Sequence, residues 1–130
     1  MSVAVRPARH KVVDSLLKDI IRDVRDLSHR YGVELGDLAG ALGVDEKTLD
    51  RWAHKEPSQP RSLFLVKERL DKLAAFCEEA DQAISNKYLS EWLYTPNAAL
   101  LGFSPVKCLS TPEGFEKVSK LVHAFRWGLP

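Results

Sequence analysis

The stretch VELGDLAGALGVDEKTLDRWAHK, residues 33 to 55, contains two short amphipathic segments separated by Gly43. In the first segment, Leu35 to Leu42, the apolar residues fall on one side, and in the second Asp45 stands where an N-cap belongs. Helices this short are not stable in isolation, so they must pack on each other and on a third element. The spacing therefore predicts a helix-turn-helix.

A longer helix is predicted before this pair, between Lys11 and Tyr31. Its apolar residues recur at steps of three and four, the period of one helix face, and Gly32 supplies a left-handed residue of the kind that ends helices. We expect this face to pack within the chain, and a dimer seam through it is the alternative. The face comprises Val13, Leu17, Ile20, Val24, Leu27 and Tyr31.

Helical spacing also follows the pair. The segment from Lys55 to Arg61, which contains Pro57 and Pro60, is expected to be a hinge or loop. A helical period resumes from Leu63 to Ile84, and a shorter amphipathic segment follows from Tyr88 to Leu93.

Two helix starts are predicted in the last third of the chain. Ser104 before Pro105 and Thr111 before Pro112 each combine a capping residue with proline at the first helical position. The final helix is expected to run from Pro112 to about Trp127. Because no stretch alternates for long with a period of two, the sequence predicts an all-α protein. We expect a helix-turn-helix domain at 1–62, a connecting helix at 63–84 and a C-terminal domain at 85–130.

Composition limits the classes of function. The chain has 130 residues and a net charge of +1, which gives no argument from bulk basicity for nucleic-acid binding, although its ends are basic and its middle is acidic. Without a signal peptide or a long apolar run, the cytosol is the expected location and no membrane span is expected. The four histidines are scattered, so we expect no metal, no cofactor and no catalytic residues. Cys77 and Cys108 are expected to be structural thiols.

The helix-turn-helix points to DNA binding. The first turns of a recognition helix enter the major groove, while flanking residues hold phosphates. Three carboxylates, Asp45, Glu46 and Asp50, oppose this role because they repel phosphate, although an acidic side chain can accept a hydrogen bond from cytosine. The candidate DNA-binding residues are Lys47, Thr48, Arg51, His54, Lys55 and Arg61.

Residues that interrupt helices are frequent in the stretch from Trp92 to Gly128, where prolines, asparagine and glycines fix the shape of loops. The apolar residues here are numerous for so small a piece, and they either complete the core or form an exposed patch for a partner. These residues are Leu100, Leu101, Phe103, Phe125 and Trp127.

The same stretch resembles the C-terminal toxin-binding domain of the Xre/MbcA/ParS antitoxins, which in that family follows an Xre-type helix-turn-helix. The resemblance covers residues 33 to 128. The helix-turn-helix part of the resemblance is weakly specific. The C-terminal part is more specific because its prolines, glycines and capping residues match the family pattern at many positions. Those positions are Trp92-Leu93, Thr95-Pro96-Asn97, Ala99-Leu100, Gly102, Ser104-Pro105, Leu109, Thr111, Glu113-Gly114, Val118 and Gly128.

The resemblance implies a type II antitoxin that is not an enzyme. Its partner would be a nearby-encoded RES-domain toxin that destroys NAD, and the antitoxin would cover the NAD cleft and repress its own operon, as a homodimer or within a larger complex. Arg126 could pair with a carboxylate or enter the polar NAD pocket, with Trp127 as an anchor beside it. The residues implied in toxin binding are Trp92, Asn97, Gly102, Phe103, Pro105, Gly114, His123, Arg126, Trp127 and Gly128.

One position departs from the family. Many relatives carry a basic residue where this chain has Phe103, so a contact made by that charge is absent or replaced by apolar burial. Two other functions are compatible with the sequence: a stand-alone transcriptional regulator whose C-terminal region dimerises, and an adaptor that has lost DNA binding.

Overall fold

A computed structural model describes residues 5–54 and 60–128, which form helices joined by short turns and contain no strand. The predicted all-α class is confirmed. The elements are α1 (Val5–Tyr31), α2 (Leu35–Leu42), α3 (Glu46–Ala53), α4 (Pro60–Ala83), α5 (Asn86–Tyr94), the 3₁₀ turn η2 (Ala98–Leu100), α6 (Pro105–Cys108) and α7 (Pro112–Trp127).

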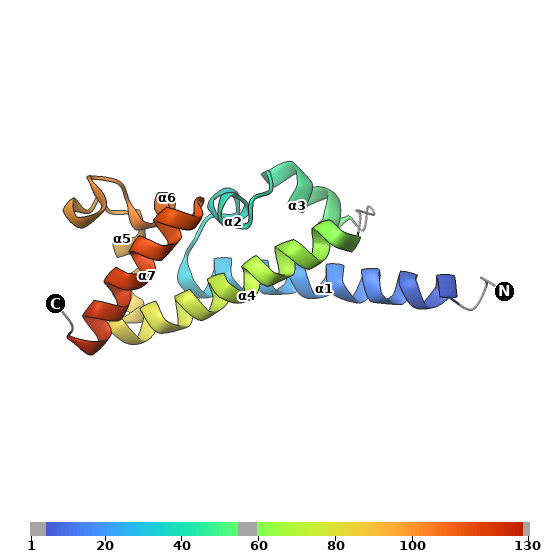
Figure 1. Cartoon of the computed structure of the whole chain (residues 1–130), viewed down its shortest axis with the longest axis horizontal. Coiled ribbons are helices and arrows are strands. Elements are labelled where there is room, and N and C mark those ends of the chain that lie inside the picture. The colour runs from blue at the N-terminus through green and yellow to red at the C-terminus, as the bar shows by residue number, and fades with distance from the viewer. Residues whose placement is uncertain (1–4, 55–59, 129–130) are drawn as a thin grey trace.

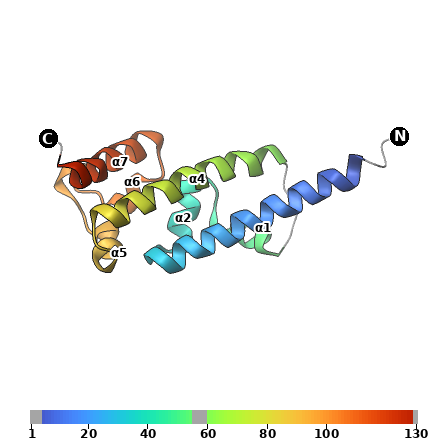
Figure 2. The same cartoon turned by 90° about the horizontal axis from the view of Figure 1, so that it is seen from below.

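Two long helices, α1 and α4, form the frame of the molecule. They lie side by side and run in the same direction along its long axis (Figure 1). The short helices α2 and α3 pack on this pair, while α7 packs on α4 near its C-terminal end (Figure 2). At 1.5 Å per residue, the 27 residues of α1 span about 40 Å. The helix-turn-helix and the C-terminal helices are therefore held on one shared frame.

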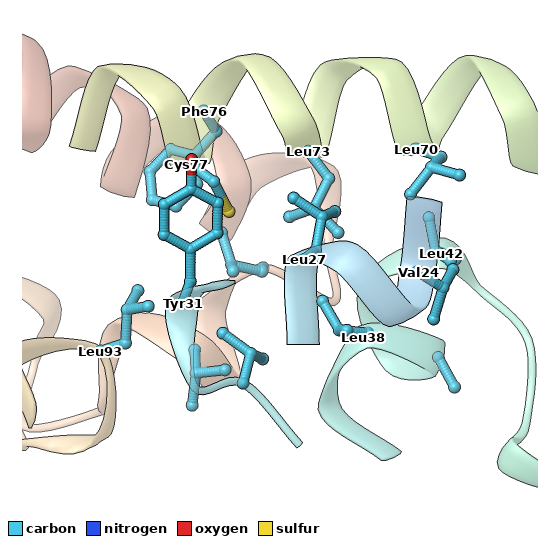
Figure 3. Packing of buried hydrophobic residues seen from close by; sticks show 14 of the residues in the cluster. Val24, Leu27, Tyr31, Leu38, Leu42, Leu70, Leu73, Phe76, Cys77 and Leu93 are labelled. Atoms are coloured by element: carbon cyan, nitrogen blue, oxygen red, sulfur yellow. The ribbon is translucent and has the colours of Figure 1, made fainter. Parts of the chain in front are cut away.

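The buried apolar residues form one continuous cluster along this frame. At its centre Leu27 and Tyr31 of α1 face Leu73 and Cys77 of α4, and Leu93 of α5 closes one end (Figure 3). The predicted apolar face of α1 is buried here within a single chain, with Val13 only partly covered. From Leu17 to Tyr31 this face packs inside one chain, as the first of the two alternatives predicts.

Several helix ends follow the sequence prediction. Gly32 and Gly43 adopt positive φ angles of 67° and 76° where α1 and α2 end. Asp45 caps α3 by accepting from the backbone N–H of Thr48, and Thr111 caps α7 by accepting from that of Gly114. The predicted bounds of the final helix, Pro112 to Trp127, are confirmed.

Other boundaries differ from the prediction. Helix α1 begins at Val5 rather than Lys11, and α5 extends from Asn86 to Tyr94. Pro60 and Arg61 belong to α4 rather than to a loop. Proline suits a first helical position because the N–H that it lacks would have no partner within the helix and because its ring fixes a helical φ. Ser104 precedes α6 with extended backbone angles but makes no capping hydrogen bond through its side chain.

Helix α5 ties the C-terminal region to the helix-turn-helix. The Tyr94 hydroxyl donates to Oδ2 of Asp37 (2.6 Å) and accepts from the backbone N–H of Glu34 (2.8 Å). One turn earlier, Ser90 Oγ donates to the carbonyl oxygen of Gly32 (3.2 Å). Burial and the Asp37 carboxylate raise the pKa of Tyr94 to about 12, so its hydroxyl stays a donor at neutral pH. These bonds fix the start of α2 against α5.

Candidate functional site

Helix α3 presents a short basic stripe to solvent. Lys47, Arg51 and His54 are all exposed, and their i, i+4, i+7 spacing places them on one side of the helix. The opposite side is held in the core by Leu49 and Trp52. The structure therefore brings together three of the six predicted DNA-binding side chains. Lys55 lies outside the described residues, and the side chain of Arg61 is likewise not described.

Thr48 has a local structural role. Its Oγ1 donates to Oδ1 of Asp45 (2.7 Å) and accepts from Nη2 of Arg51 (3.0 Å). The hydrogen bonds from Thr48 lower the pKa of the Asp45 carboxyl, which keeps the cap ionised. Asp45 is thus committed to the helix N-terminus, and the same network orients Arg51.

The remaining two carboxylates of α3 lie toward a groove between α1 and α3. Glu46 and Asp50 line this groove of about 370 Å³ together with Arg25. Asp50 also approaches the neighbouring basic stripe, because His54 Nδ1 lies 3.8 Å from its Oδ1. Arg25 of α1 lines the same groove as these two acidic groups.

The C-terminal end of α7 carries a cluster of aromatic and basic side chains. The imidazole of His123 packs against the indole of Trp127, with ring centroids 6.2 Å apart, and the Arg126 guanidinium lies 4.7 Å from the Trp127 ring. Phe125 makes an edge contact with Trp92 of α5 at 6.0 Å. Three side chains at the helix end thus contact one another, and Phe125 contacts α5 separately.

Glu79 of α4 fastens this helix end to the frame. Its Oε1 lies 3.0 Å from Nδ1 of His123. No local sequence pattern links residues 44 positions apart, so sequence reasoning did not find this contact.

The other predicted toxin-binding residues shape the backbone between these helices. Pro105 is fully buried at the start of α6, and Gly128 ends α7 with a positive φ of 66°. The side chain of Asn97 accepts from the backbone N–H of Ala99 (2.9 Å). At Gly114 an added Cβ would lie 2.2 Å from the carbonyl oxygen of Cys108, so only glycine lets α6 and α7 approach this closely.

The apolar residues of the C-terminal region divide between the core and the surface. Leu100 is buried, but Leu101 is 81% exposed, Phe103 and Trp127 are each 57% exposed, and Phe125 is 49% exposed. Phe103 is therefore not absorbed into the core of the free chain, and whether its ring replaces the contact made by a basic residue in the family stays a prediction. Four large exposed apolar side chains are called here the C-terminal apolar surface: Leu101 and Phe103 in the loop before α6, and Phe125 and Trp127 at the end of α7. Both of its parts lie at the same end of the molecule (Figure 1).

The cysteines and metal ligands can be placed as well. Cys77 is buried, and this burial raises the pKa of its thiol to about 12, which makes it an unreactive core residue. Within residues 5–54 and 60–128, no group of three or more His, Cys, Asp or Glu side chains is arranged to bind a metal. In the same part of the chain, no helix combines the length and the apolar character needed to cross a membrane.

No protein-family model, curated protein or solved structure matches the chain.

Proposed function

We propose that this protein is a cytoplasmic type II antitoxin that neutralises a RES-domain, NAD-degrading toxin and represses its own operon through α3. The observation that carries the proposal is the aromatic end of α7, where Trp127 is exposed yet in contact with both Arg126 and His123. Large apolar side chains fixed at an exposed helix end are typical of residues that anchor a protein in a partner's pocket.

Steric exclusion is sufficient for the proposed inhibition. A helix end that enters a preformed cleft buries much of its surface there and denies the cleft to a small ligand such as NAD. Arg126 supplies a planar cation suited to the carboxylate or polar groups of such a cleft, and Trp127 supplies apolar area. The antitoxin itself performs no chemistry in this mechanism.

Co-expression with a neighbouring toxin gene tests the proposal. We expect a RES-type toxin encoded beside this gene to lower cellular NAD when expressed alone, and co-expression of the antitoxin to restore the NAD level. Co-purification of the two chains should accompany the restoration. Continued NAD loss in the presence of the folded antitoxin would instead favour the stand-alone regulator.

Replacing Trp127 by alanine is expected to weaken toxin binding about 50-fold, because exposed aromatic anchors that become buried on binding cost 2 kcal/mol or more when truncated. The folded chain should be little affected, since the indole is 57% exposed. Isothermal titration with the purified toxin measures the change. Phe64→Ala is the matched control, because Phe64 is 54% exposed on the first turns of α4, away from this surface. Equal affinities for the two variants would contradict the anchor.

Replacing Arg51 by alanine is expected to weaken binding to the promoter of the operon about tenfold while toxin binding is unchanged. The physical reason is that Arg51 is the exposed cation that the Asp45–Thr48 network orients. Gel shifts at two salt concentrations measure the effect. Arg30→Ala is the control, because this exposed arginine lies in the last turn of α1 and pairs with Asp26. An unchanged shift for Arg51→Ala would favour the adaptor.

A further inference from the structure

A compact loop between α5 and α6 displays Leu101 and Phe103. The backbone N–H of Gly102 donates to the Asn97 carbonyl oxygen (2.9 Å), and the Asn97 N–H donates to the Phe103 carbonyl oxygen (3.1 Å). The N–H of Phe103 in turn donates to the carbonyl oxygen of Leu100 (3.1 Å), whose side chain is buried. Backbone hydrogen bonds thus close the loop, and the buried side chain of Leu100 anchors it to the core.

Leu101 occupies a conformation that its side chain disfavours. Its φ and ψ are 59° and 30°, and it is the one residue other than glycine with a positive φ in the part of the chain described. This left-handed position after a helical turn is where glycine or asparagine is normally found. The leucine side chain also gains nothing from packing, because it is 81% exposed. Neither local conformation nor burial accounts for leucine here.

A strained backbone that exposes an apolar side chain indicates a binding role. We infer that Leu101 is a binding residue that enters an apolar pocket of the toxin, beside Phe103 and in addition to the α7 end. This inference rests on the proposed function and adds Leu101 to the loop residues already implied in toxin binding, Asn97, Gly102 and Phe103. A rigid loop also lowers the entropic cost of binding, since its shape is set before the partner arrives.

The absence of charge around Leu101 indicates which kind of partner surface it would bind. The fifteen residues from Trp92 to Val106 contain no Asp, Glu, Lys or Arg. DNA backbone recognition needs cations, so this segment is unsuited to phosphate. The loop and the C-terminal end of α7 lie on opposite sides of the same end of the molecule (Figure 1). Leu101, Phe103 and Trp127 are all exposed. An uncharged apolar pocket on the protein that binds α7 fits these features best.

The substitution Leu101→Asn separates a binding role from a structural one. Asparagine tolerates the left-handed conformation, so the melting temperature should rise by about 2 to 5 °C. Affinity for the purified toxin should nevertheless fall at least about tenfold, because the apolar contact is lost. Thermal unfolding and isothermal titration measure the two effects. A merely structural leucine cannot produce opposite changes in stability and affinity.

Leu65→Asn is the matched control, because Leu65 is 48% exposed on α4 and should leave toxin affinity unchanged. Toxin affinity of Leu101→Asn equal to that of the parent chain would overturn the inference. So would an effect confined to self-association, detected by sedimentation of the chain alone, or to binding of neutral phosphatidylcholine vesicles. If the parent chain itself fails to bind the toxin, the proposed function fails instead, which is a different result from an insensitive Leu101 variant.

Discussion

Gly114→Ala is expected to lower the free energy of unfolding by about 3 kcal/mol, because a side chain at this position overlaps backbone. The added Cβ would lie 2.2 Å from the Cys108 carbonyl oxygen and 2.8 Å from Oγ1 of Thr111. A backbone carbonyl cannot rotate aside as the end of a flexible side chain can, so α6 and α7 must separate. The same movement would disturb the Thr111 cap, which accepts from the Gly114 N–H at 3.0 Å.

Urea unfolding followed by far-ultraviolet circular dichroism measures this loss. Gly40→Ala is the matched control, since Gly40 is also helical but an added Cβ there meets no atom within 4 Å. The control should stabilise the protein by about 0.5 to 1 kcal/mol, because alanine favours helix over glycine. Two variants with the same chemical change thus have opposite expected signs, and equal unfolding curves would refute the packing argument.

The helices could be predicted because their signals are local. The apolar residues from Val13 to Tyr31 recur with the helical period, and a short side chain such as Asp45 caps the backbone only three positions away. Pro60 shows the limit of such signals. A proline that forbids a helix interior also favours a helix start, and sequence alone did not decide between these two meanings.

Contacts between distant residues could not be predicted in this way. Tyr94 and Asp37 are 57 positions apart, and their hydrogen bond depends on how α5 meets the start of α2. The Glu79 to His123 contact spans 44 positions and depends on the packing of α7 against α4. Both pairs consist of ordinary polar residues whose types carry no pairing information. Only the tertiary arrangement distinguishes them from other exposed charges and hydroxyls.

The candidate sites were predicted unevenly for the same reason. The basic stripe of α3 follows from helical spacing, but the engagement of Thr48 with Asp45 and Arg51 depends on side-chain rotamers. For Leu101 the sequence predicts only an apolar side chain that is either buried in the core or exposed for a partner. Its positive φ and 81% exposure together distinguish it, and neither property is encoded in a residue type that usually avoids both.

A chain that ends at Val122 is expected to fold but to bind the toxin about a thousandfold more weakly, so that NAD loss resumes in cells. The truncation removes Arg126 and Trp127, which the proposed function places in the toxin cleft. It keeps Val118 and Val122, the buried residues of α7. Cellular NAD and toxin affinity, measured beside thermal unfolding, distinguish lost binding from lost structure.

The structural cost of this truncation should be small. The lost contacts are the partly exposed His123–Glu79 pair and the edge contact between Phe125 and Trp92. Exposed ion pairs contribute up to about 1 kcal/mol and aromatic pairs about 0.5 to 1.5 kcal/mol, so about 1 to 2 kcal/mol should be lost. A chain ending at Gly128 is the control and should neutralise like the full chain, because α7 ends at Trp127. Neutralisation by the chain that ends at Val122 would show that the α7 end is not what closes the cleft.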